Sequence, residues 1–224
     1  MIERVAAVVP ALNAAGSVGA VIGALRRAVP GIVVIGVDDG STDGTRRALD
    51  AECDHVIAFA ANRGKGAALR AGIASALERG CEAIVTIDAD GQHDPAAAPA
   101  LLAALADADL VIGARPREGS AMPIGRRITN ALASAAVGHI VGAPVADAQS
   151  GYRAGRRAVF EAVRALGDRY EYETEFLIGA ARAGFRVAAV PVPTVYGAPS
   201  HFRTVRDSAR VVRTIWRHRA GVTS

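Results

Sequence analysis

The sequence has few aromatic residues and few cysteines. The first shortage bears on the fold class, and the second bears on disulfide bonds. Aromatic residues make up 4% of its 224 residues, whereas hydrophobic residues make up 51%. A core of this composition consists mainly of Ala, Val, Leu and Ile, which favours alanine-rich helices packed on Val/Ile-rich strands over an all-β fold. The two cysteines, Cys53 and Cys81, have neither metal-binding nor redox spacing. We therefore expect no disulfide framework and a cytoplasmic protein.

The sequence also lacks long blocks of charge and unbroken apolar runs. Its 26 basic residues include one lysine, Lys65, and give a net charge of +4. The planar guanidinium of arginine suits phosphate partners, although a general preference for arginine codons would give the same count. Because the positive charge is dispersed, we expect no nucleic-acid partner. The uncharged stretches 5–25 and 128–146 are interrupted by Pro, Gly and Asn, so neither is expected to span a membrane.

Strand and helix signals alternate through the first half of the chain. Short apolar runs predict strands at 5–9, 32–37, 56–59, 83–87 and 110–112, with helices between them at 17–28, 43–51, 64–77 and 95–105. Ser17 is expected to cap the first helix. This order predicts an α/β fold with a mostly parallel central sheet flanked by helices, and the length fits a single domain.

From residue 113 onward the alternation fails. This half predicts helices at 126–141, 156–165 and 173–183, a strand at 186–192 and an arginine-rich helix at 203–219. No linker separates it from the first half, so we expect it to complete the same domain. The last helix either packs its apolar stripe on the domain or contacts anionic lipid headgroups.

Acidic side chains follow the strand at 83–87, in the segment IVTIDADGQHDP. Asp88 and Asp90 are one residue apart, and Gln92 follows them. Carboxylate and amide oxygens bind Mg²⁺ or Mn²⁺, and such an ion neutralises a diphosphate leaving group. An acidic turn that only caps the next helix is the alternative. Because ligands bind beyond the carboxyl ends of buried parallel strands, we expect Asp88, Asp90 and Gln92 to bind a metal.

Two further segments have a composition seen at phosphate or nucleotide sites. In VDDGSTDGT, Asp39 either accepts hydrogen bonds from a base or ribose or belongs to a plain strand-to-helix turn. In NRGKG, the spacing and the missing Ser/Thr do not match a phosphate-binding loop. We interpret Lys65 as part of a glycine-rich helix start without a catalytic role.

Six segments occur in an order that resembles a known family. They are VVPALN, VDDGSTDGT, NRGKGAALRAG, DADGQHDP, GAR and DAQSGYRA. The chain resembles family 2 glycosyltransferases over essentially its whole length, and most of all the dolichyl- and polyprenyl-phosphate sugar synthase group. The resemblance implies a GT-A fold, a nucleoside-diphosphate sugar donor, and inversion at the anomeric carbon. The expected acceptor is a polyprenyl phosphate at the inner membrane face. A soluble hydroxyl acceptor and a non-catalytic nucleotide-sugar-binding protein are the alternatives.

The resemblance also implies roles for individual residues. The nucleotide-binding half, about 1–114, would line the donor pocket with Pro10, Leu12, Val37 and Asp39, and would hold metal and diphosphate with Asp88, Ala89, Asp90 and Gln92. In the acceptor-side half, about 115–224, Arg115 would bind a phosphate of the donor or of the lipid. Arg117 and Arg126 are weaker candidates for the same task.

The sequence departs from the family pattern at two places. Leu12 and Ala14 stand where the family has tyrosine and glutamate, so an expected carboxylate contact to the nucleotide is missing. In the late segment, where the synthases carry a basic pair on the diphosphate, this chain has Thr194 and His201, and Arg203 is a possible replacement. His201 is interpreted either as a phosphate or metal ligand or as a surface histidine.

Asp147, in DAQSGYR, is the remaining acidic candidate. A hydroxyl acceptor needs a general base, and Asp147 is the first choice, followed by Glu173 and Glu175. A phosphate acceptor is already anionic and needs none, in which case Asp147 would orient Arg153 or the acceptor. A structural salt bridge is the third possibility. The catalytic residues expected from the sequence are therefore Asp90, Arg115 and Asp147.

Overall fold

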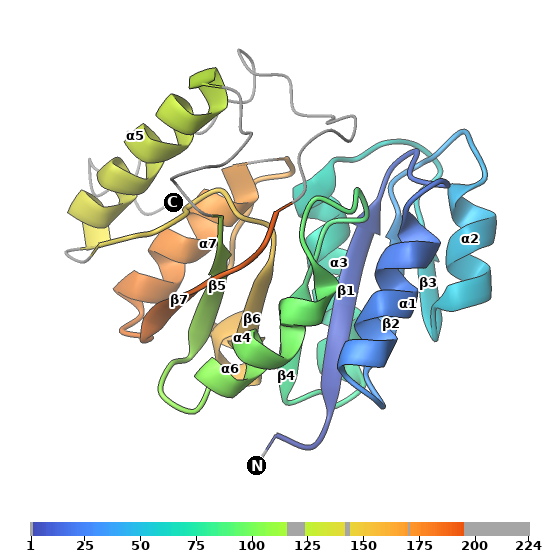
Figure 1. Ribbon diagram of the computed structural model, residues 1–224, viewed down its shortest axis with the longest axis horizontal. Helices are drawn as coiled ribbons and strands as arrows, with labels where there is room; N and C mark the ends of the chain where they lie inside the picture. Colours follow the sequence, from blue (N-terminus) through green and yellow to red (C-terminus); the bar gives the residue numbers. More distant parts are fainter. Residues whose placement is uncertain (1, 116–123, 142–143, 170, 195–224) are drawn as a thin grey trace.

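The computed structural model describes residues 2–115, 124–141, 144–169 and 171–194, and a seven-stranded sheet runs through them (Figure 1). The strand order is β3-β2-β1-β4-β6-β5-β7. The strands are β1 (Val5–Ala11), β2 (Val33–Asp38), β3 (His55–Ala58), β4 (Ala83–Thr86), β5 (Leu110–Ala114), β6 (Arg153–Arg156) and β7 (Val187–Pro191). The neighbouring strands are parallel except where β6 pairs with β4 and β5. The predicted α/β fold with a mostly parallel sheet is confirmed.

Helices cover both faces of this sheet (Figure 1). They are α1 (Val18–Ala28), α2 (Thr45–Glu52), α3 (Lys65–Glu78), α4 (Ala98–Ala104), α5 (Ile124–Val141), α6 (Arg157–Ala162) and α7 (Glu171–Arg182). Apolar residues of α1, α2 and α4 form one buried cluster with the sheet, and those of α3, α6 and α7 form the other. In β1, Ala6 and Val8 enter one cluster while Ala7 and Val9 enter the other. Side chains of a strand alternate between faces, so a strand covered on both sides must be apolar throughout.

The structure differs from the sequence-based prediction at three elements. The antiparallel strand β6 was not predicted, because Arg153–Arg156 has no apolar run. The helix predicted at 95–105 is a 3₁₀ turn, Pro95–Ala97, followed by α4. Ser17 does precede α1, but its hydroxyl does not cap the helix and instead donates to the carbonyl of Ala89, at 2.7 Å. The helix predicted at 203–219 lies outside the described residues.

With 18 residues, α5 is the longest helix that the structure describes. Neither α5 nor any other helix in the described ranges is apolar over a length sufficient to cross a membrane.

The parallel pairing brings the carboxyl ends of β1, β2 and β4 to the same edge of the sheet, the upper edge in Figure 1. Pro10 is opposite Val37 and Ala11 is opposite Asp38, while Val8 pairs with Thr86 near the end of β4. The segments that leave these strands therefore meet at this edge. They carry most of the residues that the sequence marks as candidates for a binding site.

Candidate active site

The loop after β4 places the two aspartates of the Asp-x-Asp segment. Asp88 and Asp90 are half-buried, and Oδ1 of Asp90 accepts a hydrogen bond from the backbone N–H of Gln92 at 3.0 Å. Between them, the side chain of Ala89 is buried in the hydrophobic cluster under α1. The carbonyl of Ala89 accepts a hydrogen bond from Ser17, so the residue that precedes α1 anchors this turn.

Asp39, predicted to contact the nucleotide, has a carboxylate that binds the neighbouring loop. It accepts hydrogen bonds from the backbone N–H of Arg63 at 2.7 Å, from that of Gly64 at 2.9 Å, and from Nδ2 of Asn62 at 3.1 Å. Burial raises the pKa of Asp39, and the two backbone donors partly offset this. Asp39 therefore joins the end of β2 to the start of α3. A contact between Asp39 and a nucleotide stays a prediction.

The same junction depends on Gly40. Its φ of 75° lies in the left-handed region, and a Cβ there would lie 2.5 Å from the carbonyl carbon of Ala61 and 2.6 Å from the nitrogen of Asn62. We expect Gly40→Ala to lower the free energy of unfolding by about 2–4 kcal/mol, because backbone strain and overpacking add. Chemical denaturation measures this. Gly16→Ala, where a Cβ meets nothing within 4 Å, is the control, and equal stability of the two variants would contradict the prediction.

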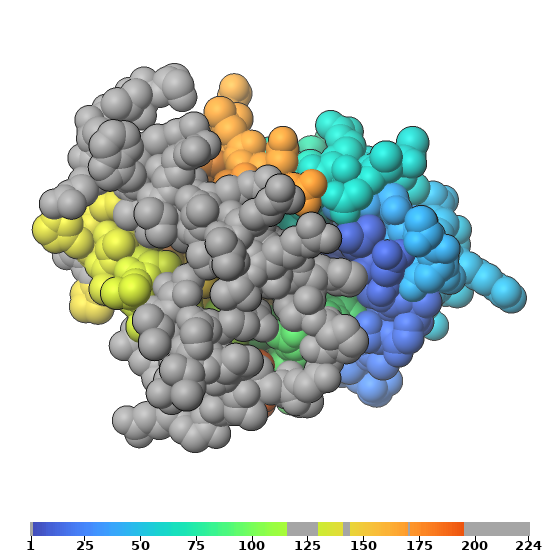
Figure 2. Space-filling view, turned by 90° about the horizontal axis from the view of Figure 1, so that it is seen from above, coloured from blue at the N-terminus to red at the C-terminus, as the bar shows by residue number. Residues whose placement is uncertain are grey.

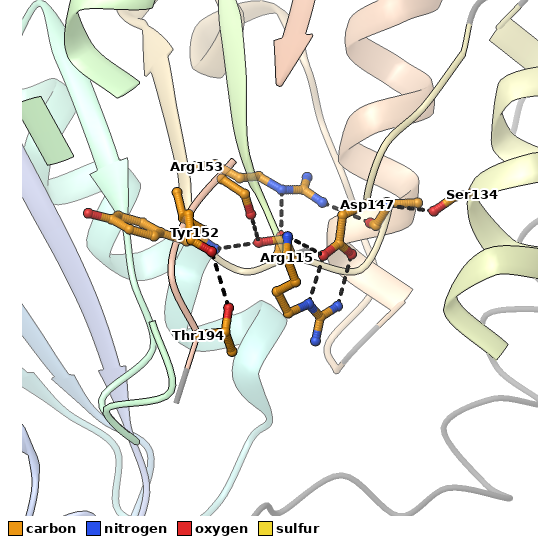
Figure 3. A network of polar contacts seen from close by, with 10 residues as sticks. Arg115, Ser134, Asp147, Tyr152, Arg153 and Thr194 are labelled. Atoms are coloured by element: carbon orange, nitrogen blue, oxygen red, sulfur yellow. Dashed lines mark hydrogen bonds and ion pairs between the residues drawn. The ribbon is translucent and has the colours of Figure 1, made fainter. Parts of the chain in front are cut away.

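Arg115 and Asp147 form a buried ion pair at the end of β5 (Figure 3). Oδ2 of Asp147 accepts from Nε of Arg115 at 2.7 Å, and Oδ1 accepts from Nη2 at 2.8 Å. The backbone N–H of Arg115 donates to the same carboxylate at 3.2 Å. The Asp147 side chain is 1% exposed and that of Arg115 is 8% exposed. This bidentate geometry fixes the plane of the guanidinium.

The environment of Asp147 keeps its carboxylate ionised. Burial alone would raise the pKa of Asp147, but the hydrogen bonds and charge of Arg115 lower it below its usual value. Next to Asp147, the backbone N–H of Ala148 donates a hydrogen bond to Oγ of Ser134, in α5, at 3.1 Å. Asp147 thus forms a salt bridge that also orients a basic side chain, and that side chain is Arg115 rather than Arg153. A role for Asp147 as a general base stays a prediction.

Arg153, on β6, is held by three backbone carbonyls instead (Figure 3). Its guanidinium donates to Ser150, Ala148 and Glu173, at 2.7–2.9 Å. Burial lowers the pKa of Arg153, yet an arginine stays charged in a protein. Arg153 thereby ties the DAQSGYR segment to the first turn of α7.

Lys65, to which the sequence analysis gave no catalytic role, lies inside the candidate site. Its Nζ is 2.6 Å from Oδ1 of Asp88 and 2.7 Å from Oε1 of Glu173. Burial alone would lower the pKa of Lys65, but the two carboxylates raise it above its usual value, so the ammonium is charged. Lys65 in turn lowers the pKa of Asp88 against the effect of burial. The one sequence signal for Lys65 is that it is the single lysine among 26 basic residues.

His93 is a second buried polar residue beside this cluster. It is 5% exposed, and neither ring nitrogen has a hydrogen-bond partner among the described residues. Its ring lies 5.6 Å from that of Tyr152, and burial lowers the pKa of His93 to about 4. A buried imidazole without partners is rare in folded proteins. It marks a place where a ligand could supply the missing hydrogen bond.

The structure gives fewer contacts for the other predicted site residues, and some of them lie outside the described residues. Pro10 and Val37 are buried at adjacent strand ends, and Leu12 is half-buried just beyond β1. Thr194 donates to the carbonyl of Val192 and forms a β-bridge with His93. Arg126 lies in α5, but its side chain is outside what the structure describes, as are Arg117, His201 and Arg203.

The donor atoms present suit a hard divalent cation. Asp88, Asp90 and the buried amide of Gln92 offer oxygen ligands on one loop, which is the ligand type that Mg²⁺ and Mn²⁺ prefer. The described residues contain no group of three His, Cys, Asp or Glu side chains placed to hold a metal. Two protein carboxylates that leave positions for substrate phosphates are nevertheless the usual arrangement for Mg²⁺.

Acidic and basic side chains gathered beyond the carboxyl ends of parallel strands are the arrangement expected of a ligand site in an α/β protein. Comparison with known proteins gives the family. The model of the glycosyl transferase family 2 matches residues 6–164. This chain belongs to that family.

Two relatives of known function are similar to this chain over most of its length. An undecaprenyl-phosphate mannosyltransferase of Micrococcus luteus is 36% identical over 205 residues, covering 86% of this chain and 84% of its own length. A polyprenol monophosphomannose synthase of Mycolicibacterium smegmatis is 34% identical over 205 residues, covering 85% of this chain and 77% of its own. Both belong to the group whose motifs the sequence resembles.

Solved structures show the same fold. One of them is the glucosyl-3-phosphoglycerate synthase of Mycobacterium tuberculosis, crystallised with Mn²⁺, UDP and glucosyl-3-phosphoglycerate. It superposes on this chain with a TM-score of 0.79 and is 24% identical in sequence. The match covers 99% of this chain and 81% of the synthase chain. A crystal structure of that enzyme with Mg²⁺ and UDP gives a TM-score of 0.77. The chain thus has a GT-A fold. Its membership of the glycosyl transferase family 2 makes it a glycosyltransferase.

Proposed function

We propose that this chain transfers a sugar, with inversion, from a nucleoside-diphosphate sugar to a polyprenyl phosphate at the inner membrane surface. The donor is bound beyond β1, β2 and β4, where Asp88, Asp90 and Gln92 hold Mg²⁺ or Mn²⁺ together with the diphosphate. When bound, the cation neutralises charge on the departing nucleoside diphosphate. The likeness to two lipid-phosphate mannosyltransferases at 36% and 34% identity supports this acceptor class.

One structural observation carries the choice of acceptor: each acid that the sequence offered as a general base is already engaged. Asp147 is bound by Arg115 through both oxygens, and Glu173 is paired with Lys65. Oε2 of Glu175 accepts from the backbone N–H groups of Leu166 and Gly167, at 2.8 and 2.7 Å. A hydroxyl acceptor would need one of these carboxylates to take its proton. A phosphate oxygen is already an anion and needs none.

Arg115 is the group we assign to the phosphate. Asp147 holds its guanidinium by Nε and Nη2. A guanidinium presents its N–H donors in a planar fork, a geometry that suits a phosphate group. Residues of the acceptor-side half that lie outside the described ranges, His201 and Arg203 among them, remain proposed contacts for the same phosphates.

A matched pair of acceptors tests the acceptor assignment. Labelled nucleotide sugars, Mn²⁺ and the protein are incubated with a polyprenyl phosphate or with the corresponding polyprenol, and the label extracted into organic solvent is measured. We expect labelled lipid with the phosphate only, at a rate at least about 100-fold above that with the polyprenol, because a general base supplies about 10²–10⁴-fold for a hydroxyl nucleophile.

Equal transfer to polyprenol would contradict the phosphate assignment and favour a hydroxyl acceptor. Donor binding without turnover on any acceptor would favour a nucleotide-sugar-binding protein, the reading that Leu12 and Ala14 support. Removal of divalent cations with a chelator should stop lipid labelling, and added Mn²⁺ should restore it.

A further inference from the structure

Lys65 lies between carboxylates that come from the two halves of the chain. It is the first residue of α3, Asp88 follows β4, and Glu173 is in the first turn of α7. The side chains of Lys65, Asp88 and Glu173 are 16%, 24% and 3% exposed. An ion pair so enclosed is screened far less by solvent than a surface pair. Its geometry therefore constrains all three groups.

Three glycines make this close approach possible. Gly64 and Gly66, on either side of Lys65, face the backbone of residues 167–168, and a Cβ at either position would overlap with a carbonyl oxygen there. The N–H of Gly66 donates to the carbonyl of Asp168 at 2.8 Å. The start of α3 is thereby docked against the segment that leads into α7, and the two regions are adjacent in the view from above (Figure 2). This docking brings Glu173 to the Lys65 ammonium.

The third glycine, Gly151, lies against the pair itself. A Cβ at this position would lie 2.5 Å from Nζ of Lys65 and 2.7 Å from Oδ2 of Asp88. The chain uses arginine at the other 25 of its 26 basic positions. The single lysine of the chain thus falls where a compact ammonium contacts two carboxylates beside a glycine.

Lys65 supplies the positive charge that contacts both Asp88 and Glu173. Without the lysine, Asp88 and Glu173 would be like charges close together, which drives the two carboxylates apart. That movement would take Asp88 out of position as a ligand for a cation.

We propose that Lys65 is a positioning residue that holds the Asp88 carboxylate in place for the divalent cation and ties it to Glu173 on the acceptor side. The inference rests on the proposed function, because it assumes that Asp88 contacts the metal–diphosphate group. Lys65 acts through Asp88 and takes no part in the chemical step. Its removal should therefore weaken metal binding, and removal of the repelling charge on Glu173 should partly restore it.

The test measures Mn²⁺ binding by electron paramagnetic resonance, with Mn²⁺ alone and with UDP or GDP in parallel samples. The variants are Lys65→Met, Glu173→Gln and the double variant, with circular dichroism as the check of folding. We expect the Mn²⁺ dissociation constant of Lys65→Met to rise ten- to hundred-fold, as for other groups that orient a metal ligand. The double variant should bind several-fold more tightly than Lys65→Met and more weakly than the unaltered protein.

Arg79→Met is the matched control, because it removes a basic side chain at the far end of the same helix, where Nη1 of Arg79 donates to Ser75. Its Mn²⁺ affinity should stay within about twofold of the unaltered protein. An unchanged affinity in Lys65→Met, or a double variant no better than Lys65→Met, would overturn the inference. If Lys65→Met does not fold, the double variant decides, and unaltered affinity there overturns it. If the unaltered protein binds no Mn²⁺ in any sample, the proposed function fails instead.

Discussion

Replacing Asp90 with alanine is expected to lower the rate of nucleoside-diphosphate release by about 10³-fold, or about 4 kcal/mol in the activation barrier. Asp90 is half-buried beyond β4, and one of its oxygens receives the N–H of Gln92. If it binds the cation, its loss removes the charge that steadies the diphosphate as the bond to the sugar breaks. The rate is measured at saturating donor over a range of Mn²⁺ concentrations.

Asp94→Ala is the matched control for this prediction. It removes a carboxylate from the same loop, where Asp94 accepts from the N–H of Ala96 at 2.9 Å and begins a 3₁₀ turn. Loss of such a cap costs about 0.5–2 kcal/mol of stability, and turnover should stay within about threefold of the unaltered protein. A rate for Asp90→Ala within tenfold of the unaltered protein, with an unchanged metal requirement, would contradict the metal assignment.

The sheet could be predicted from the sequence because burial on both faces leaves a simple pattern. Strands such as β2 and β4 are apolar at nearly every position, and acidic residues follow where each ends. In a parallel sheet these ends meet at one edge, so the convergence of Pro10, Asp39 and Asp88 follows from order along the chain. This part of the site is determined by local sequence and by the direction of the strands.

Strand β6 could not be predicted, since no local pattern specifies it. The sequence of Arg153–Arg156 is polar and small, and the strand exists because its backbone pairs with β4 on one side and β5 on the other. The Arg153 side chain is buried because three backbone carbonyls accept its hydrogen bonds, one of them from Glu173 in α7. Such compensation arises from tertiary structure and leaves no periodic signal.

The ion pairs of the site were inaccessible to sequence reasoning for a similar reason. Asp147 was expected to act as a base, to orient Arg153 or to form a salt bridge within its own motif, and the structure shows a salt bridge to Arg115, outside that motif. Lys65 and Glu173 are on separate helices whose packing depends on the glycines between them. Which cation meets which carboxylate is decided by the docking of whole elements. The residue types were visible in the sequence, but their partners were not.

The Arg115–Asp147 pair leads to the second large effect. Asp147→Ala should lower the free energy of unfolding by about 3–5 kcal/mol, because it leaves the Arg115 guanidinium buried without the carboxylate that binds it. The double variant Arg115→Met with Asp147→Ala should recover at least half of this loss, since it removes the stranded charge as well. It should nevertheless stay as inactive as Arg115→Met alone, because Arg115 is the proposed phosphate ligand. Urea denaturation and transfer rates measured on the same samples give both quantities.

The pH dependence of the Asp147→Ala effect follows from the same pair. The pKa of Asp147 is lower in the folded chain than its usual value. The stabilisation is therefore fully present above the unfolded pKa, about 3.9, and is lost as the pH falls through the depressed folded value. The stability difference between the unaltered protein and Asp147→Ala should be constant between about pH 5 and 8 and should shrink below about pH 4. A difference that grew as the pH fell from 8 to 6 would mean that the folded-state pKa of Asp147 is raised into that range, as for a general base, and would argue for a hydroxyl acceptor.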